Sequence, residues 1–293
     1  MNDSTLSDFT LNDFTLKTED GTVISATLFK PSDGPKAGVI INSATAVGRH
    51  YYGNFAQYLR QQGITVITYD YRGIGGSNVK PARDKSLTMQ AWGEQDFNAV
   101  IAWASAEYPQ LNWHCIGHSV GGQIVGLAEL NSKLKSVYLV AAQSGYWRNW
   151  SGLSRAKNGL IWYVLVPLLS RLFGFFPGAL MGGENLPEKV ARQWGRWCRN
   201  KHYICDEQGD AYRPFFSSFD KKMCFVQLAD DHTFAPMKAV KQLHDFYDGA
   251  HRSIVRFTPQ HFGQKYIGHF GFFKKQNEQG LWQHALKWIE DSA

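Results

Sequence analysis

Two hydrophobic patterns alternate along most of the chain. Short runs of consecutive apolar residues are typical of strands covered on both faces, and they occupy residues 37–42, 64–69, 111–116, 137–140, 223–228 and 254–257. Longer stretches with apolar residues at helical spacing lie between them, at residues 51–62, 87–107, 120–130, 236–247 and 278–289. This alternation predicts an α/β protein with a mostly parallel, doubly wound sheet and helices on both of its faces.

A different pattern precedes the alternation. Residues 15–17 and 22–29 are rich in β-forming side chains, and they flank the turn-forming E-D-G run at 19–21. Two such runs joined by a short turn form a β-hairpin. We therefore predict a hairpin before the first parallel strand.

The alternation is interrupted by residues 143–222, where the composition changes. This stretch holds 12 of the 31 Lys+Arg residues but only 6 of the 25 Asp+Glu residues, and five of the ten tryptophans. The rest of the chain is balanced at 19 basic and 19 acidic residues, so the formal net charge of +6 belongs to this stretch. We predict a main domain formed by residues 1–142 and 223–293, and an insertion formed by residues 143–222.

Composition narrows the classes of function. With 44% hydrophobic and 19% charged residues, the chain has the composition of a folded globular protein. The basic insertion carries no recognised nucleic-acid motif, so we expect no nucleic acid as a partner. The four cysteines lack the paired spacing of a disulfide framework or an evident zinc site, which indicates reduced thiols in a cytoplasmic protein. We expect no metal or other cofactor.

The apolar stretches do not predict membrane insertion. Residues 1–13 contain three aspartates and no apolar core of an export signal. The most apolar stretch, residues 161–177, is interrupted by Pro167, Arg171 and Gly174, and it falls short of the roughly 20 apolar residues that a membrane span needs. We expect at most a peripheral membrane contact, made by the insertion.

The strongest chemical signal is the G-H-S-V-G-G run at residues 117–122, between a predicted strand and a predicted helix. A G-x-S-x-G run in this setting is typical of a nucleophile elbow, because the glycines permit a turn so sharp that the serine hydroxyl projects above the sheet. The alternative is a glycine-rich turn in which Ser119 only caps the helix. We predict that Ser119 is a catalytic nucleophile.

A second run, Y-D-Y-R-G-I-G-G-S at residues 69–77, resembles the D-x-R-G-x-G-x-S loop of the α/β-hydrolase superfamily. Together with the N-S-A-T run at 42–45 and the I-G-H-F-G-F-F run at 267–273, the two motifs make the chain look like an uncharacterised bacterial branch of predicted α/β-hydrolases. The resemblance implies an eight-stranded sheet, a helical cap in place of the insertion, and catalytic residues in the order Ser, Asp, His. Asp70 and Arg72 of the second run are expected to be structural and to pair with each other.

A serine nucleophile needs a base, and the base needs an orienting carboxylate. In the α/β-hydrolases that the chain resembles, the acid follows a strand and the base lies in a loop before the last helix. The A-D-D-H-T run at 229–233 offers two acids, and we favour Asp231, with Asp230 as the alternative that caps the turn. His269 is the predicted base, and His261 is its main competitor.

The remaining site residues are predicted from their positions. The backbone N–H groups of Val120 and Ala44 are expected to form the oxyanion hole. His118 is expected to shape the site from within the elbow. Trp147 and Trp194 of the insertion are expected to contact the substrate, although packing against the main domain is the alternative for each indole.

These residues predict a serine hydrolase that cleaves a carboxylic ester or thioester through an acyl-enzyme. The aromatic and basic insertion favours a small-molecule substrate with an apolar acyl or aryl part and an anionic group. An acyltransferase, an amidase or a peptidase uses the same triad and stays an alternative. A non-catalytic protein that binds a ligand or a membrane surface on a hydrolase scaffold is the alternative from another class.

Overall fold

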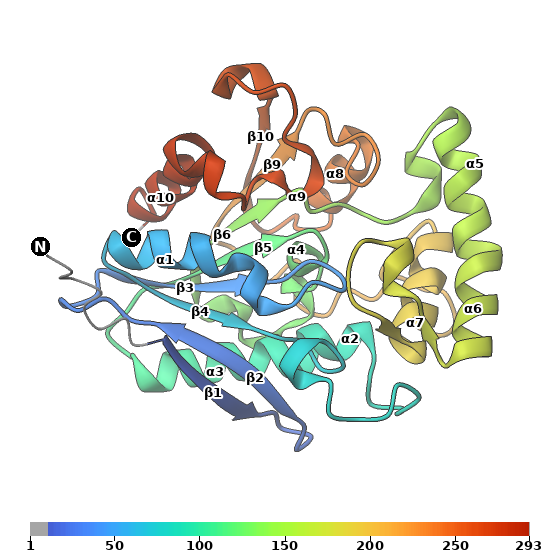
Figure 1. Cartoon of the computed structure of the whole chain (residues 1–293), viewed down its shortest axis with the longest axis horizontal. Helices are drawn as coiled ribbons and strands as arrows, with labels where there is room; N and C mark the ends of the chain where they lie inside the picture. Colours follow the sequence, from blue (N-terminus) through green and yellow to red (C-terminus); the bar gives the residue numbers. More distant parts are fainter. Residues whose placement is uncertain (1–10, 293) are drawn as a thin grey trace, which may run out of the picture.

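The computed structural model describes residues 11–292, which form one large sheet flanked by helices (Figure 1). Its eight strands follow the order β1-β2-β4-β3-β5-β6-β9-β10. β2 runs antiparallel to both β1 and β4, and all other neighbouring strands run parallel. The strands are β1 Leu11–Lys17, β2 Val23–Phe29, β3 Ala37–Asn42, β4 Ile64–Tyr69, β5 Trp113–His118, β6 Leu134–Val140, β9 Lys222–Leu228 and β10 His251–Phe257.

The central strands follow from the apolar runs of the sequence. Every residue of β3, β4 and β5 is buried, because parallel strands with helices on both sides leave neither face to water. The hairpin forms where it was predicted, with Leu16 of β1 opposite Ile24 of β2. The predicted α/β class and the mostly parallel, eight-stranded sheet are confirmed.

Helices cover both faces of the sheet, with α1 and α10 on one side and α3 on the other (Figure 1). Phe55 and Tyr58 of α1 contact Trp282, whose ring lies 5.3 Å and 5.4 Å from theirs, just before α10 begins. The helices are α1 Gly53–Gln61, α2 Met89–Ala91, α3 Asn98–Glu107, α4 Val120–Gln123, α5 Gly152–Leu160, α6 Val166–Phe173, α7 Glu188–Arg199, α8 Met237–His244, α9 Gly268–Gly271 and α10 Gln283–Glu290.

The helix predicted at residues 120–130 is much shorter than expected. α4 ends at Gln123 and is followed by 3₁₀ turns at Val125–Leu127 and Glu129–Lys133. Glycine disfavours a helix interior, and three glycines lie in this stretch. At Gly126 a Cβ would lie 2.4 Å from the ring of Phe216, so a glycine is needed here to leave room for that ring.

The helix predicted at residues 87–107 contains a π-helical stretch, Trp92–Phe97, between α2 and α3. This stretch carries Asp96, which accepts from the Arg72 backbone N–H at 2.8 Å and from Arg72 Nε at 2.7 Å. Asp70 instead accepts from the backbone N–H and the guanidinium of Arg49. The expected pairing of Asp70 with Arg72 is therefore wrong, because each of these buried charges has a separate partner.

The predicted insertion occupies the connection between β6 and β9. We call residues 141–221 the β6–β9 segment; the last residue of the predicted insertion, Lys222, already belongs to β9. The segment contains α5, α6, α7 and a small two-stranded sheet of β7 Phe175–Phe176 and β8 Leu186–Pro187. Its helices lie beside the carboxyl ends of the parallel strands (Figure 1).

Within residues 11–292, no helix is both long enough and apolar enough to cross a membrane. Residues 1–10, which carry most of the stretch examined for an export signal, lie outside the described residues. The four cysteines, Cys115, Cys198, Cys205 and Cys224, are all buried and unpaired.

Candidate active site

Ser119 stands between the end of β5 and the start of α4, in a strained backbone conformation. Its φ of 53° and ψ of −116° are uncommon for any residue other than glycine. A Cβ on Gly117 would lie 2.8 Å from the backbone of Gly121, and a Cβ on Gly121 would lie 2.3 Å from the carbonyl oxygen of Asn42. Close backbone approach therefore requires both glycines, and the turn has the geometry that a nucleophile elbow needs.

Asp231, in the turn after β9, and His269, in the short helix α9 after β10, form a buried pair. His269 Nδ1 lies 2.5 Å from Asp231 Oδ2, and the other carboxylate oxygen accepts from the Phe234 N–H at 3.0 Å. Because a carboxylate oxygen accepts this hydrogen bond, we assign a proton to Nδ1 of the imidazole. Nε2 is then the basic nitrogen, available to take a proton from a nucleophile.

Asp230 has different partners from its neighbour. Its Oδ2 accepts from the backbone N–H groups of Ile267 at 2.7 Å and Gly268 at 3.0 Å. Gly268 has a φ of +63°, and a Cβ there would lie 2.0 Å from the Tyr266 hydroxyl. Asp230 thus holds the turn that leads into His269, while Asp231 binds the imidazole itself.

His118 joins the elbow to the His269 loop. Its Nε2 lies 2.9 Å from the carbonyl oxygen of His269, and its Nδ1 lies 2.9 Å from the Tyr52 hydroxyl. Burial, with a smaller contribution from His269, lowers the pKa of His118 well below its usual value, so the ring is neutral. Since a carbonyl only accepts, the proton sits on Nε2, and Nδ1 accepts from Tyr52.

The Tyr52 hydroxyl continues this chain of hydrogen bonds to the loop after β3. It accepts from the Ala44 backbone N–H at 2.8 Å. Burial raises the pKa of Tyr52 well above its usual value, which keeps its own proton for His118. A single relay, from Ala44 through Tyr52 and His118 to His269, therefore connects the loop after β3, the end of β5 and the short helix α9.

This relay corrects one expectation about the oxyanion hole. The Ala44 N–H carries one proton, and that proton is already donated to Tyr52, so Ala44 does not fit the expected role of second oxyanion donor. Val120 is buried at the first position of α4, directly after Ser119. The hydroxyl of Thr45, next to Ala44, is buried without a hydrogen-bond partner.

The rings of Phe234 and Phe270 contact the His269 imidazole, and Tyr51 contacts Phe270 in turn. None of these three residues was predicted from the sequence. Phe234 stacks obliquely on His269 with ring centroids 4.8 Å apart, and Phe270 meets it edge-on at 5.1 Å. Tyr51 donates its hydroxyl proton to the Phe270 carbonyl oxygen at 2.6 Å. Phe234 is 41% exposed and Tyr51 is 36% exposed, so an apolar rim borders the buried pair. We call these three residues the aromatic rim.

Trp147 and Trp194 contact other residues of the β6–β9 segment. Trp194 donates its Nε1–H to the Tyr203 hydroxyl at 3.0 Å, and its ring meets Trp162 at 4.7 Å. Trp147 packs edge-on against Tyr163 at 5.9 Å. The Arg148 and Arg155 guanidiniums each lie 5.2 Å from the Trp147 ring. These contacts give both indoles a structural role in the segment, and their contact with substrate stays a prediction.

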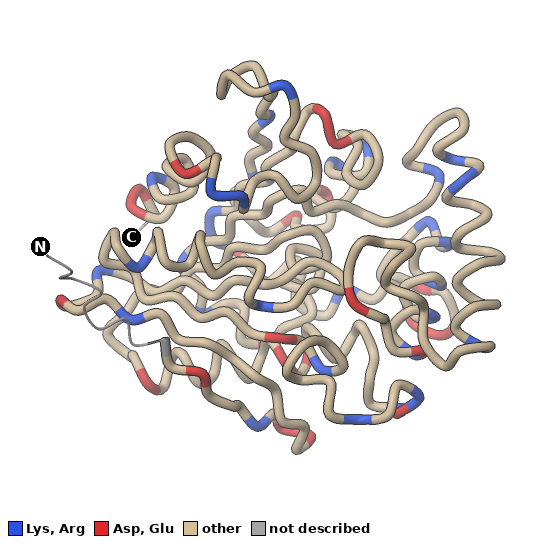
Figure 2. Tube along the Cα trace, viewed as in Figure 1, with Lys and Arg blue, Asp and Glu red and all other residues tan. Residues whose placement is uncertain are grey.

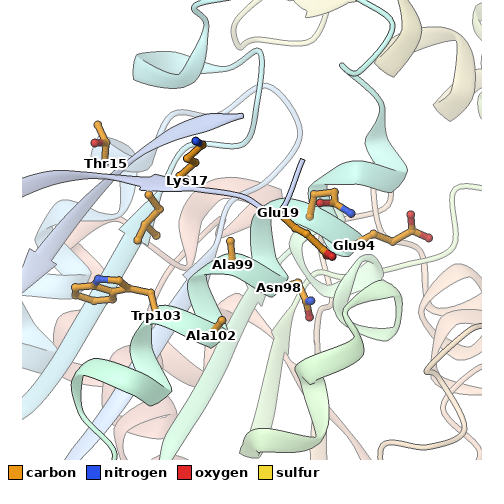
Figure 3. Close-up of a pocket in the computed structure, with 10 residues that line it drawn as sticks. Thr15, Lys17, Glu19, Glu94, Asn98, Ala99, Ala102 and Trp103 are labelled. Atoms are coloured by element: carbon orange, nitrogen blue, oxygen red, sulfur yellow. The ribbon is translucent and has the colours of Figure 1, made fainter. Parts of the chain in front are cut away.

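A separate hollow of about 440 Å³ lies between β1 and α3 (Figure 3). Glu19, Glu94, Asn98 and Trp103 are among the residues that line it. Its lining includes none of the residues to which we assign a chemical role. Over the part of the chain that the structure describes, no group of three or more His, Cys, Asp or Glu side chains is arranged to hold a metal ion.

Comparison with known sequences extends these observations. Residues 33–181, just over half of the chain, match the family model described as serine aminopeptidase, S33. The monoacylglycerol lipase of Mycolicibacterium smegmatis (strain ATCC 700084 / mc(2)155) is 29% identical over 105 residues. That match spans only 36% of this chain and 36% of the lipase.

Solved structures resemble nearly the whole chain at low sequence identity. A highly thermostable carboxyl esterase from Bacillus coagulans, in complex with glycerol, is 13% identical with a TM-score of 0.66, over 97% of this chain and 99% of that chain. A soluble variant of monoglyceride lipase from Saccharomyces cerevisiae, in complex with a substrate analog, is 14% identical with a TM-score of 0.62, over 99% and 96%. An esterase from Exiguobacterium antarcticum is 15% identical with a TM-score of 0.61, over 95% and 100%. At such identities the likeness concerns the fold.

Proposed function

Because the chain belongs to the serine aminopeptidase S33 family of α/β-hydrolases, we propose that it is a serine hydrolase that cleaves carboxylic esters. The observation that carries the proposal is the buried His269–Asp231 pair, held by hydrogen bonds beside the elbow on which Ser119 stands. Such a pair supplies the base that a serine hydroxyl lacks at neutral pH.

The proposed reaction has two halves. His269 Nε2 takes the proton of the Ser119 hydroxyl as Oγ attacks the carbonyl carbon, and it then gives that proton to the departing alcohol. Asp231 orients the ring and stabilises its charged form. The same nitrogen then takes a proton from a water molecule that attacks the acyl carbon, and it returns that proton to Ser119 Oγ as the acyl–Oγ bond breaks and the acid leaves.

The tetrahedral intermediates need donors for their oxyanion. The Val120 N–H at the start of α4 is the first donor in this proposal. Thr45 is our candidate for the second, because its buried hydroxyl has no partner and its loop follows β3. The side-chain amide of Asn42, at the end of β3, donates to the Gly121 carbonyl oxygen at 3.0 Å, which supports the placement of this loop beside the elbow.

In this proposal the predicted insertion, residues 143–222 and thus nearly all of the β6–β9 segment, acts as a cap on a main domain of residues 1–142 and 223–293. The segment touches the loops around the elbow: the Glu184 N–H donates to the Ala46 carbonyl oxygen at 2.8 Å, and Glu184 Oε2 accepts from the Gly75 N–H at 2.8 Å. The aromatic rim and the indoles of the segment favour substrates with an apolar acyl or aryl part. Its excess of basic residues favours substrates that carry a negative charge.

The leaving group is not determined by the triad. One relative that matches part of the chain is a monoacylglycerol lipase, which favours an alcohol as the leaving group, while the family description names an aminopeptidase. A thioester or amide substrate, or an acyl acceptor other than water, needs no change in the triad. The four unpaired cysteines support a cytoplasmic site of action.

The experiment that tests the proposal combines covalent labelling with a substrate panel. A fluorophosphonate probe is expected to label the wild-type protein and Ser154→Ala, an exposed serine of α5, but not Ser119→Ala. Hydrolysis of ester, thioester and amide panels of graded acyl length then identifies the leaving group. Folded protein that the probe does not label contradicts a hydrolase and favours a binding function. Equal rates for neutral short esters and anionic long-chain esters contradict the proposed role of the cap.

A further inference from the structure

The outermost helices of the β6–β9 segment expose a row of aliphatic side chains. α5 and α6, joined by the π-helical stretch Ile161–Leu165, form a continuous helical rod at the edge of the molecule (Figure 1). Five large aliphatic side chains on this rod are between 46% and 87% exposed. They are Leu153, Leu160, Val164, Leu168 and Leu172, and we call them the α5–α6 outer face.

The row has the regularity of a helix face. From Leu160 to Leu172 the exposed residues recur every four positions, which places them on one side of the rod. Trp162, Val166 and Ser170 recur at the same spacing and are buried. The side that carries them packs on α7, where Trp162 meets Trp194.

Exposed apolar side chains of this size are concentrated in this region. Of the 13 large hydrophobic residues that are exposed in the described part of the chain, eight lie between Leu153 and Leu180. Isolated exposed leucines are ordinary, whereas a contiguous apolar row on an unpartnered helix marks a surface that binds something.

The charge of the rod indicates which partner fits. Between residues 152 and 173 the chain has Arg155, Lys157 and Arg171, all exposed, and no Asp or Glu (Figure 2). Arg148, also exposed, lies just before α5. Aliphatic side chains flanked by long basic side chains, without acids, are typical of a helix that lies in a membrane surface. Lys and Arg then extend toward anionic headgroups while their neighbours enter the acyl region.

We propose that the α5–α6 outer face docks on a lipid surface that carries anionic headgroups. The rod lies in the plane of that surface and does not cross it. The β6–β9 segment also touches the loops around Ser119, through the Glu184–Ala46 hydrogen bond. Docking therefore presents the site to esters held in the lipid. This last step rests on the proposed function, whereas the docking itself does not depend on it.

The test measures binding separately from catalysis. Sedimentation with vesicles of phosphatidylcholine, with and without phosphatidylglycerol, compares the wild-type protein with the triple variant Leu160→Gln/Leu168→Gln/Leu172→Gln. The control variant, Val23→Gln/Val79→Gln, replaces exposed apolar residues elsewhere on the surface. We expect the wild type and the control to bind vesicles that contain phosphatidylglycerol, and the triple variant to bind at least about tenfold more weakly.

Charge is tested by Arg155→Gln/Lys157→Gln/Arg171→Gln, which is expected to lose most of the preference for phosphatidylglycerol and most of the sensitivity to salt. Unchanged melting temperatures and unchanged fluorophosphonate labelling of Ser119 verify that the variants fold. Equal vesicle binding by the triple variant and the wild type overturns the proposal. So does a wild-type dimer, detected by light scattering, that the triple variant dissociates, because the face then joins two copies of the chain. A protein that binds vesicles but is not labelled refutes the proposed hydrolase and leaves the docking intact.

Discussion

The same substitution, Asp to Asn, is expected to have different effects at the adjacent residues Asp230 and Asp231. Asp231→Asn removes the charge that stabilises the His269 imidazolium and no longer fixes its tautomer, so kcat is expected to fall by about 10³–10⁴. Asp230→Asn keeps a carbonyl oxygen that can accept from Ile267 and Gly268, and a loss of less than about tenfold is expected. Steady-state hydrolysis of a short ester measures both variants. If Asp230→Asn lowered kcat more than Asp231→Asn, Asp230 would be the residue that orients His269.

Tyr52 is the residue through which the relay acts on the loops around Ser119. Tyr52→Phe leaves the Ala44 N–H and His118 Nδ1 buried without a partner, which is expected to lower the free energy of unfolding by about 1–3 kcal/mol. Because His118 holds the His269 backbone, we also expect kcat to fall by about tenfold with little change in KM.

The control for this prediction is Tyr58→Phe in α1, the helix that begins directly after Tyr52; the Tyr58 ring packs against Trp282. Urea unfolding gives the stability of both variants, and ester hydrolysis well below the melting temperature gives kcat and KM. If Tyr52→Phe lowers the stability and leaves kcat unchanged, the relay holds the fold together without positioning His269.

At this scale the sequence predicts residues that stand at the ends of strands, because strand ends and turn motifs are local signals. Ser119 and the two aspartates at 230 and 231 were predicted in this way. Tyr52 was not, because its role depends on where the turn before α1 places its hydroxyl relative to β5, and no local pattern encodes that distance. The role of Ala44 was mispredicted for the same reason, since a neighbour on another element takes its proton.

At the scale of elements, prediction succeeded where burial was uniform. β3 and β4 have the predicted bounds, because each is a fully buried run closed by turn-forming residues. The prediction failed at α4, where glycines that allow close contact with neighbouring backbone and side chains interrupt the helix. The π-helical stretch Trp92–Phe97 was not predicted either, because the hydrophobic periodicity of the sequence does not distinguish this wider turn, which carries Asp96, from an α-helix.

Tyr203 connects the β6–β9 segment to the elbow helix. Its hydroxyl donates to Gln123 Oε1 of α4 at 2.6 Å and accepts from Trp194 Nε1 of α7 at 3.0 Å. Tyr203→Phe leaves both groups without this partner, so the free energy of unfolding is expected to fall by about 1–3 kcal/mol in urea titrations. Tyr266→Phe, at a tyrosine that is 66% exposed, is expected to change it by less than about 0.5 kcal/mol. Equal small effects would mean that the segment is held by its other contacts.

At the scale of the whole molecule, the net charge of +6 describes only one part. The β6–β9 segment and the first residue of β9 carry the excess, and the balanced remainder builds the sheet and the site (Figure 2). The distribution of charge thus concerns what approaches the segment, a substrate or a lipid surface, and not the stability of the sheet.

The pH dependence of stability is expected to arise in part from His114, a buried residue of β5. Burial, together with the nearby charge of Lys135, lowers the pKa of His114 from 6.5 to about 4. The folded chain therefore resists a proton that the unfolded chain accepts. The contribution of neutral His114 to the free energy of unfolding is fully present above pH 6.5 and is lost as the pH falls toward 4. The loss amounts to about 3 kcal/mol.

His114→Asn removes this titration and keeps a polar atom near the Ser136 hydroxyl, which lies 2.8 Å from His114 Nδ1. Urea unfolding at about pH 7 and about pH 4.5 is expected to show a smaller acid-induced loss of stability in the variant, by about 2–3 kcal/mol. The variant retains some loss, because burial also lowers the pKa of His118. An equal loss in both proteins would mean that His114 accepts its proton without unfolding the sheet, and that the acid sensitivity arises elsewhere in the chain.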